Sequence, residues 1–254
     1  MGLNSKKINL LVMPTDICNM NCIYCFHSVH HKKTEKMSLE TLKKLYDITF
    51  SEYSEVTIIW HGGEPLIMGL DFYKKAIEMQ KDYDCKINNR MQSNLTLLTD
   101  EFSDFLCDND IGIGTSFDGC KNDLLRGNSN KILEGRNKIL KNNKQCGFIM
   151  VVSKKNIDNL IESYEYFKSI NANFTMNMYV PTNESMDDIL RLNPKETIER
   201  IRLELPEINF FKSSPKSFLN RNIDFNCLLI LSNSLEIGNK YSCICLFYHK
   251  LNVK

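Results

Sequence analysis

The sequence predicts an α/β fold: a partial (β/α)6 TIM-like barrel followed by a short irregular C-terminal extension. Short runs rich in Ile, Val, Met and Phe alternate with longer segments whose apolar residues recur at the helical period. Successive strand–helix units of this kind build a parallel sheet wound in one sense, because β-α-β crossovers are right-handed. Eight units would close a full barrel, so six are expected to leave it open.

Strands and helices are expected in strict alternation. The strands are expected at Ile8–Met13, Val56–Trp60, Lys86–Gln92, Ile111–Phe117, Gly147–Ser153 and Phe174–Val180. The helices are expected at Ser38–Phe50, Leu70–Lys81, Thr99–Asn109, Lys131–Asn142, Ile157–Ser169 and Pro194–Leu203. The first helix has the clearest start, because Ser38 is a favoured N-cap and Glu40 suits the first turn. In such a sheet, ligand-binding residues belong in the loops at the carboxyl ends of the strands.

The regular alternation stops near Leu205, which divides the chain into two parts. Residues 1–205 are expected to form the barrel, and residues 206–254 a linker and a cysteine-containing segment. Residues 206–226 combine Pro, Ser, Asn, Phe and Lys without a period, which is typical of irregular structure. A strand-like run, Leu228–Leu231, then precedes a glycine and a Cys-x-Cys pair.

Composition and net charge limit the cellular location and the binding partners that the sequence predicts. The formal net charge is +1, so no global basic surface predicts binding to nucleic acid or to an anionic membrane. The apolar run near the start is too short for a signal peptide or a membrane span. We therefore expect a soluble, cytoplasmic protein. In a reducing compartment, ten cysteines favour metal or cluster ligation over disulfides.

Three of those cysteines lie in the loop after the first strand. Cys18, Cys22 and Cys25 have the spacing Cys-x3-Cys-x2-Cys, so that three thiolates of one compact loop can converge on one face of a cluster. A four-iron cubane takes four ligands, and three leave one iron open. An open coordination position is typical of a reactive metal centre rather than a structural one. The loop therefore predicts a reactive iron–sulfur site.

Glycines or short polar residues follow the carboxyl ends of the next strands. In chain order they are Gly62, Gly63, Glu64, Pro65, Ser93, Asn94, Ser116 and Asp118, with Arg126 shortly after. Glycines let the backbone approach a ligand, small polar groups bond sugar hydroxyls, and an arginine fork suits a carboxylate. Each feature also has a plain structural interpretation: a tight turn, the start of a helix, a capped turn or a solvated arginine. Their recurrence at successive strand ends predicts a ligand site there.

Together these motifs resemble the radical S-adenosylmethionine (radical SAM) superfamily. The resemblance rests on the "PT..CN..C.YC" frame, with Tyr24 before its last cysteine, and on the HGGEP, QSN and SFDG…R segments. It implies that the three cysteines hold a 4Fe-4S cluster whose fourth iron chelates S-adenosylmethionine. One electron from the cluster then cleaves the sulfonium to a 5′-deoxyadenosyl radical, which abstracts hydrogen from a substrate. The cofactor supplies this chemistry, and the protein supplies positioning and exclusion of water.

The resemblance also implies roles for residues on the first strands. Tyr24 occupies the family's aromatic position in the cysteine loop. Gly62, Gly63, Glu64 and Pro65 match the family's GGEP motif, which binds the amino group of the ligand's methionine. The carboxylate of Glu64 would balance that ammonium.

Further matches follow on the third and fourth strands. Ser93 and Asn94 stand where the family has a Thr-Asn-Gly ribose contact, but this chain has Ser93 for Thr and Leu95 for Gly. Ser116 and Arg126 match a segment whose serine approaches the ribose and whose arginine pairs with the ligand's carboxylate. A bidentate guanidinium suits that pairing.

Two further residues complete the implied cofactor contacts. Asp118 is expected to contact the ribose or the substrate. Val151, on the fifth strand, is expected to face the adenine. No residue is assigned a catalytic role of its own.

The pattern is closest to the SPASM subgroup, which includes anaerobic sulfatase-maturating enzymes and peptide maturases. Cys227, Gly238 and Cys243 fit the opening of that subgroup's auxiliary-cluster region, and Cys245 follows. The alternative is a core strand with a free thiol. The subgroup's later cysteines are missing, so three interpretations stay open: a natural short form, a truncated product, or a site that takes a further ligand from elsewhere. An auxiliary iron–sulfur cluster on Cys227, Cys243 and Cys245 is a secondary prediction, and these three local thiols alone do not complete it.

The leading functional hypothesis is a radical SAM enzyme that modifies a peptide or protein. Its partners would be that substrate and a flavodoxin- or ferredoxin-like electron donor. The alternatives are a radical SAM enzyme for a small metabolite, a non-catalytic cluster-binding remnant, and a structural zinc protein. In the last case, one of three nearby histidines would complete the site: His27, His30 or His31.

Overall fold

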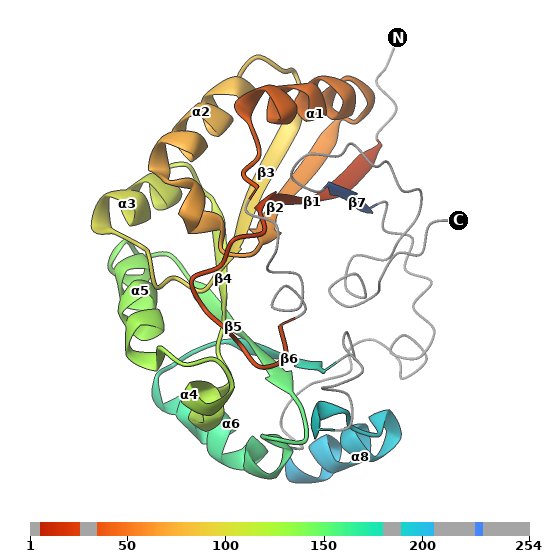
Figure 1. The fold of residues 1–254 in the computed structure, drawn as a ribbon, viewed down its shortest axis with the longest axis vertical. Helices are drawn as coiled ribbons and strands as arrows, with labels where there is room; N and C mark the ends of the chain where they lie inside the picture. The colour runs from red at the N-terminus through yellow and green to blue at the C-terminus, as the bar shows by residue number, and fades with distance from the viewer. Residues whose placement is uncertain (1–5, 26–34, 180–188, 206–226, 231–254) are drawn as a thin grey trace.

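The fold is an open, curved sheet of seven parallel strands with helices along its outer side (Figure 1). The computed structural model describes residues 6–25, 35–179, 189–205 and 227–230. Across the sheet the strands follow the order β6-β5-β4-β3-β2-β1-β7. Their bounds are β1 Lys7–Thr15, β2 Glu55–Gly62, β3 Lys86–Ser93, β4 Gly112–Ser116, β5 Cys146–Val152, β6 Phe174–Met178 and β7 Cys227–Ile230.

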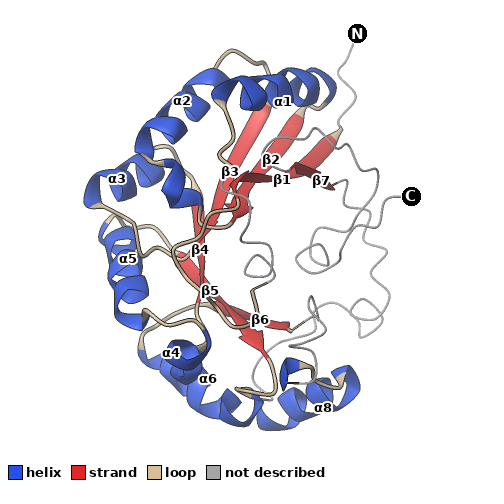
Figure 2. Ribbon diagram, viewed as in Figure 1, coloured by secondary structure: helices blue, strands red, loops and turns tan. Residues whose placement is uncertain are grey.

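Among the described residues, the longer helices lie on the convex side of the sheet (Figure 2). The α-helices are α1 Leu39–Glu52, α2 Leu70–Gln80, α3 Asp100–Asp108, α4 Asn122–Leu125, α5 Ser129–Lys141, α6 Leu160–Ser169 and α8 Pro194–Glu204. Short 3₁₀ turns are η2 Pro65–Met68, η3 Gly119–Lys121 and η4 Ile157–Asn159. The expected partial barrel is confirmed, with element bounds shifted by only a few residues.

Local sequence explains why these elements form. Ser38 caps α1, because its Oγ accepts a hydrogen bond from the Thr41 N–H at 3.0 Å. Strand β2 alternates buried and half-buried residues, and its buried set includes Ile58 and Trp60. Those two pack into one core with α1 and α2, so the other face of β2 is left toward the concave side.

A second core cluster reaches into the cysteine loop. Met20, Cys22 and Tyr24 are buried there, together with the β5 residues Phe148 and Val151. A loop that carries buried side chains is fixed by packing as well as by its ends. The cysteine loop is therefore part of the folded barrel, not an appendage to it.

The seventh strand shows that part of the segment after residue 205 belongs to the sheet. The expected run Leu228–Leu231 forms β7 at Cys227–Ile230, which pairs in parallel with β1, with Asn9 opposite Cys227. Without this strand, one side of β1 would present unpaired backbone groups, and an edge strand readily accepts a further strand. The sheet therefore has one strand more than the six predicted units.

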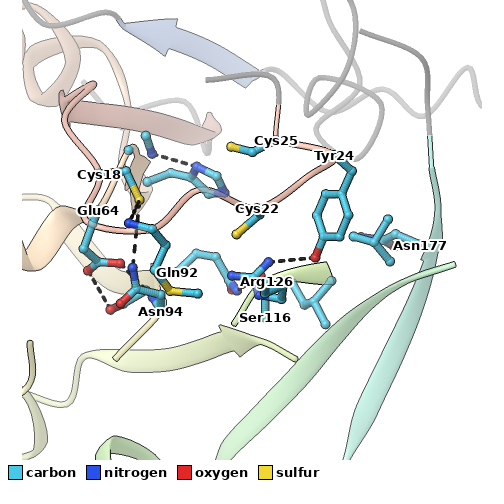
Figure 3. Close-up of a pocket in the computed structure, with 17 residues that line it drawn as sticks. Cys18, Cys22, Tyr24, Cys25, Glu64, Gln92, Asn94, Ser116, Arg126 and Asn177 are labelled. Carbon is cyan, nitrogen blue, oxygen red and sulfur yellow. Dashed lines mark hydrogen bonds between the residues drawn. The ribbon is translucent and has the colours of Figure 1, made fainter. Parts of the chain in front are cut away.

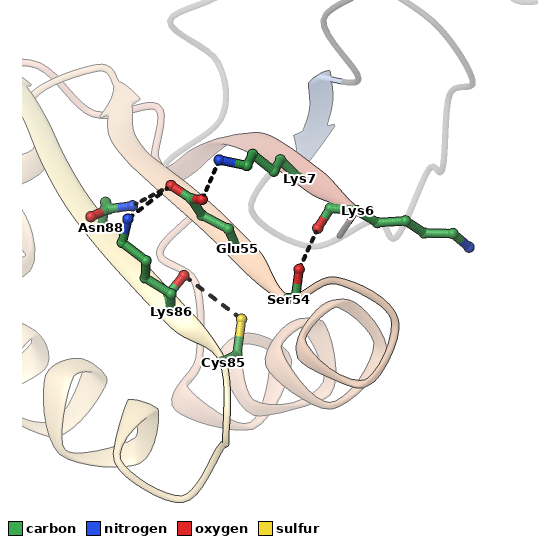
Figure 4. A network of polar contacts seen from close by, with 7 residues as sticks. All are labelled: Lys6, Lys7, Ser54, Glu55, Cys85, Lys86 and Asn88. Atoms are coloured by element: carbon green, nitrogen blue, oxygen red, sulfur yellow. Dashed lines mark hydrogen bonds and ion pairs between the residues drawn. The ribbon is translucent and has the colours of Figure 1, made fainter. Parts of the chain in front are cut away.

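An ion-pair network joins the amino ends of the strands, opposite the cysteine loop (Figure 4). The Glu55 carboxylate of β2 lies 2.6 Å from Lys7 Nζ of β1 and 3.3 Å from Lys86 Nζ of β3. Hydrogen bonds from these two lysines lower the pKa of Glu55. At this end of a barrel such contacts tie strands together rather than bind ligands. Within the described residues, no helix has the length and apolarity needed to cross a membrane.

Candidate functional site

A pocket opens at the carboxyl ends of the strands, with a volume of about 840 Å³ when its open mouth is included. The sequence predicted most of its lining: Cys18, Cys22, Tyr24, Cys25, Gly62, Gly63, Glu64, Ser93, Asn94, Ser116, Arg126 and Val151. These residues come from the cysteine loop, from strands β2 to β5 or their loops, and from the end of α4. Parallel strands bring their carboxyl ends together, so motifs far apart in the sequence meet in one place.

Sequence reasoning missed five residues of the lining. They are Met20, His61, Gln92, Ile149 and Asn177. A signal existed for some of them, because Ile149 lies two positions before Val151 on β5 and side chains two apart share a face of a strand. Asn177 is a polar residue near the end of the expected strand Phe174–Val180, but no motif marked it as a ligand residue.

The three cysteines of the loop face the same space (Figure 3). None of the three forms a disulfide with another described residue, and the Cys18 Sγ accepts a hydrogen bond from the Met20 N–H at 3.4 Å. Burial raises the pKa of Cys22 to about 11 and also raises that of Cys18. Thiols of this kind become thiolates when a metal group supplies positive charge, so binding a cluster would release protons. This donor set fits an iron–sulfur cluster.

The glycine pair at the end of β2 holds the cysteine loop in place. The Gly63 N–H donates to the Thr15 carbonyl at 3.0 Å, and the Glu64 N–H donates to the Ile17 carbonyl at 2.8 Å. A Cβ on Gly62 would lie 2.5 Å from the Thr15 oxygen, and one on Gly63 would overlap the Ile17 oxygen. Gly62 also has a φ of +108°, which favours glycine. The two glycines therefore line the pocket and also let the loop backbone pack directly against β2.

Glu64 joins the ends of β2 and β3 from a buried position. Its Oε1 accepts hydrogen bonds from the Leu66 N–H at 3.0 Å and the Ser93 hydroxyl at 2.7 Å. Its Oε2 accepts from the Asn94 N–H at 2.7 Å. Burial raises the pKa of this carboxyl, and the three hydrogen bonds act in the opposite direction. Glu64 is thus a structural tie as well as part of the pocket wall.

Replacing Glu64 by glutamine is expected to lower the free energy of unfolding by about 1–3 kcal/mol, because the amide NH₂ would face a buried donor that then lacks an acceptor. Urea denaturation of the purified protein measures this change. Glu101→Gln is the matched control, since the Glu101 side chain is 74% exposed on α3. Equal midpoints for both variants would show that the Glu64 hydrogen bonds do not stabilise the fold.

Asn94 ties β3 to the cysteine loop. Its Nδ2 donates to Asn19 Oδ1 at 2.9 Å and lies 3.9 Å from Cys18 Sγ. The next residue, Leu95, has a φ of +60°, in the left-handed region that favours glycine. The radical SAM pattern has glycine at this position, so the departure noted in the sequence places a strained leucine there.

Two of the residues expected to bind the cofactor lie outside the pocket lining. Pro65 is buried at the start of η2. Asp118 is fully buried behind the pocket wall, where its Oδ2 accepts from the Tyr24 hydroxyl at 2.6 Å and its Oδ1 accepts from the Val151 N–H at 2.8 Å. Ser116 does line the pocket and accepts from Gln92 Nε2 at 3.2 Å.

Arg126 brings a cation to the pocket opposite the cysteines. Its Nη1 donates to the Tyr24 hydroxyl at 2.8 Å (Figure 3). Its Nε is buried, with no hydrogen-bond partner among the described residues. The pKa of Arg126 is raised, because attraction to Tyr24, Cys22 and Asp118 outweighs the effect of burial. Because Arg126 lines the pocket, its guanidinium fits an anionic ligand group such as a carboxylate.

Several of the predicted metal ligands lie outside the described residues. Cys243, Cys245 and the three histidines of the zinc alternative all do. Cys227 lies in β7, next to β1. Within the described ranges, no three His, Cys, Asp or Glu side chains are placed to hold a single metal ion.

Comparison with known proteins identifies relatives of this chain. A serine-type anaerobic sulfatase-maturating enzyme of Bacteroides thetaiotaomicron is 34% identical over 188 residues, which cover 67% of this chain and 45% of that protein. A cysteine-type anaerobic sulfatase-maturating enzyme of Clostridium novyi is 28% identical over 216 residues, covering 75% and 57%. The chain thus spans about half the length of these curated relatives.

Solved structures show the same architecture. Native anSMEcpe with bound AdoMet and Kp18Cys peptide aligns with a TM-score of 0.71 at 25% identity, over 78% of this chain and 59% of that one. Streptococcus suis SuiB bound to its precursor peptide SuiA aligns with a TM-score of 0.59 at 15% identity, over 98% and 66%, and shows likeness of fold alone. The model of the radical SAM superfamily matches residues 12–193, which hold the cysteine loop and every residue of the pocket. The chain belongs to the radical SAM superfamily.

Proposed function

We propose that this protein is a radical SAM enzyme that acts on a peptide or protein. A 4Fe-4S cluster held by Cys18, Cys22 and Cys25 would supply the electron that cleaves S-adenosylmethionine to a 5′-deoxyadenosyl radical, which abstracts hydrogen from the substrate. The observation that carries the proposal is that the three cysteines of one loop and the side chain of Arg126 line the same pocket.

The chain's own groups would position the cofactors. Arg126 would pair with the carboxylate of S-adenosylmethionine, and the backbone at Gly62 and Gly63 would receive its amino group. Ile149 and Val151, on one face of β5, supply an apolar wall suited to the adenine. Glu64 and Asn94 hold the cysteine loop against the ends of β2 and β3 through the hydrogen bonds described above.

The peptide part of the proposal draws on the relatives. The two curated relatives are named for maturing sulfatases, and anSMEcpe has been solved with a peptide bound. The pocket of this chain is open at its mouth on the concave side, where a side chain of a large substrate can reach. We also propose that the protein works in the cytoplasm with a flavodoxin- or ferredoxin-like electron donor. We propose further that residues 1–205 form the barrel and that residues 206–254 form a linker and a SPASM-like cysteine segment.

The first experiment measures what the purified protein binds and does without oxygen. After reconstitution with iron and sulfide we expect about four of each per chain, and 5′-deoxyadenosine on reduction with S-adenosylmethionine. One zinc per chain and no cluster would support the structural zinc alternative. A cluster without 5′-deoxyadenosine would support the non-catalytic remnant. Transfer of deuterium from a labelled candidate peptide into 5′-deoxyadenosine separates a peptide substrate from a small metabolite.

Arg126→Lys is expected to raise the Kd for S-adenosylmethionine about tenfold or more, because an ammonium cannot reproduce the planar fork of a guanidinium on a carboxylate. Equilibrium binding to the reconstituted protein measures this. Arg202→Lys on α8, outside the pocket, is the matched control. An unchanged Kd for Arg126→Lys would remove Arg126 from the proposed site.

A further inference from the structure

A hydrogen-bonded chain runs from the pocket into the core through the hydroxyl of Tyr24. Arg126 Nη1 donates to that hydroxyl at 2.8 Å, and the hydroxyl donates to Asp118 Oδ2 at 2.6 Å. A guanidinium only donates and a carboxylate only accepts, so the single hydroxyl proton of Tyr24 must point to Asp118. The order of the chain is therefore fixed: Arg126, Tyr24, Asp118.

Both ends of this chain are anchored. Asp118 is fully buried, its second oxygen accepts from the Val151 N–H, and its own N–H donates to Asn122 Oδ1 at 3.1 Å. Beside Arg126, the Leu125 carbonyl accepts a hydrogen bond from the Ile23 N–H of the cysteine loop at 3.0 Å. The cysteine loop therefore contacts the segment that carries Arg126 through two consecutive residue pairs, Ile23 with Leu125 and Tyr24 with Arg126.

These hydrogen bonds also fix the orientation of the Arg126 guanidinium. With Nη1 bonded to Tyr24, the planar guanidinium has one edge fixed, and its buried Nε remains without a partner among the described residues. Among the described residues no ion pair within 4.0 Å joins Asp118 to Arg126, and the Tyr24 hydroxyl bridges the two side chains. The hydroxyl therefore separates two opposite charges that would otherwise attract each other directly.

We infer that Tyr24 and Asp118 are positioning residues that hold the Arg126 guanidinium toward the pocket, and that they couple carboxylate recognition to the cysteine loop. The inference rests on the proposed function, in which Arg126 takes the carboxylate of S-adenosylmethionine. It differs from the sequence-based expectation for Asp118, which placed that side chain against the ribose or the substrate. Without the Tyr24 hydroxyl, the buried guanidinium is expected to turn toward Asp118 and away from the ligand.

A ligand-side comparison isolates this role. Equilibrium Kd values for S-adenosylmethionine and for decarboxylated S-adenosylmethionine are measured on the reconstituted wild type, Tyr24→Phe, Asp118→Asn and the control Tyr166→Phe. Tyr166 stacks on Phe117 away from the pocket lining. The preference for the carboxylated ligand, a ratio of two Kd values, cancels effects that weaken both ligands equally.

We expect Tyr24→Phe to lower that preference about tenfold, Asp118→Asn to lower it by less, and Tyr166→Phe to leave it at the wild-type value. An unchanged preference in both Tyr24→Phe and Asp118→Asn would overturn the inference. If Tyr24→Phe does not hold a cluster, the ligand preference of Asp118→Asn tests the inference instead, because Asp118 lies outside the cysteine loop and the pocket lining. Failure of both to hold a cluster would assign these residues to loop structure alone. A wild type that binds neither ligand would instead contradict the proposed function.

Discussion

Changing Cys18, Cys22 and Cys25 together to alanine is expected to remove all cluster iron, from about four atoms per chain to none. Production of 5′-deoxyadenosine should fall to the level of a reaction without protein. The reason is geometric, since these are the three thiols that line the pocket in the part of the chain that the structure describes. Iron and sulfide analysis, the visible absorbance of the cluster and product chromatography measure the result.

The matched control removes thiols from elsewhere in the barrel. Cys85 and Cys120 are free thiols outside the pocket lining, and the double change to alanine should keep the full iron content and rate. Retention of the cluster in the triple variant would contradict the proposed site. Loss of the cluster in the control as well would mean that cysteine number, not the loop, determines iron binding.

Gly63→Ala is expected to lower S-adenosylmethionine cleavage about 100-fold, because a misplacement of about 1 Å at a reacting centre can cost that much. The new Cβ would overlap the Ile17 oxygen and come within 2.6 Å of the Asp16 carbonyl carbon. Both are backbone atoms, so the loop itself must move. The shift would also strain the backbone hydrogen bonds from Gly63 to Thr15 and from Glu64 to Ile17.

A glycine in another strand, Gly112, provides the control for Gly63→Ala. At Gly112, the first residue of β4, an added Cβ would meet its nearest neighbour, Arg90 Cγ, at an ordinary contact distance of 3.4 Å. Gly112→Ala should therefore keep wild-type iron content and cleavage. Circular dichroism of both variants separates a displaced loop from an unfolded barrel. Wild-type cleavage by Gly63→Ala would show that the glycine is not needed for loop placement.

Sequence alone determined the strand–helix alternation, the partial barrel and the identity of most pocket residues. Hydrophobic periodicity and capping are local properties, as the Ser38 cap of α1 illustrates. The parallel topology then places every strand's carboxyl end at one edge. For that reason the cysteine loop, the glycine pair and Ser116 could be assigned to one site without coordinates.

Tertiary structure alone decided which groups these residues contact. Asp118 was expected to face a ligand, yet its side chain bonds Tyr24, which lies 94 residues away in the sequence. The glycine pair receives the backbone of the cysteine loop, and β7 pairs with β1 across most of the chain's length. Such contacts depend on side-chain direction and on the distance between segments after folding. Periodicity indicates which face of its own element a side chain occupies, but it does not identify a partner on a distant segment, because it describes only neighbours along the chain.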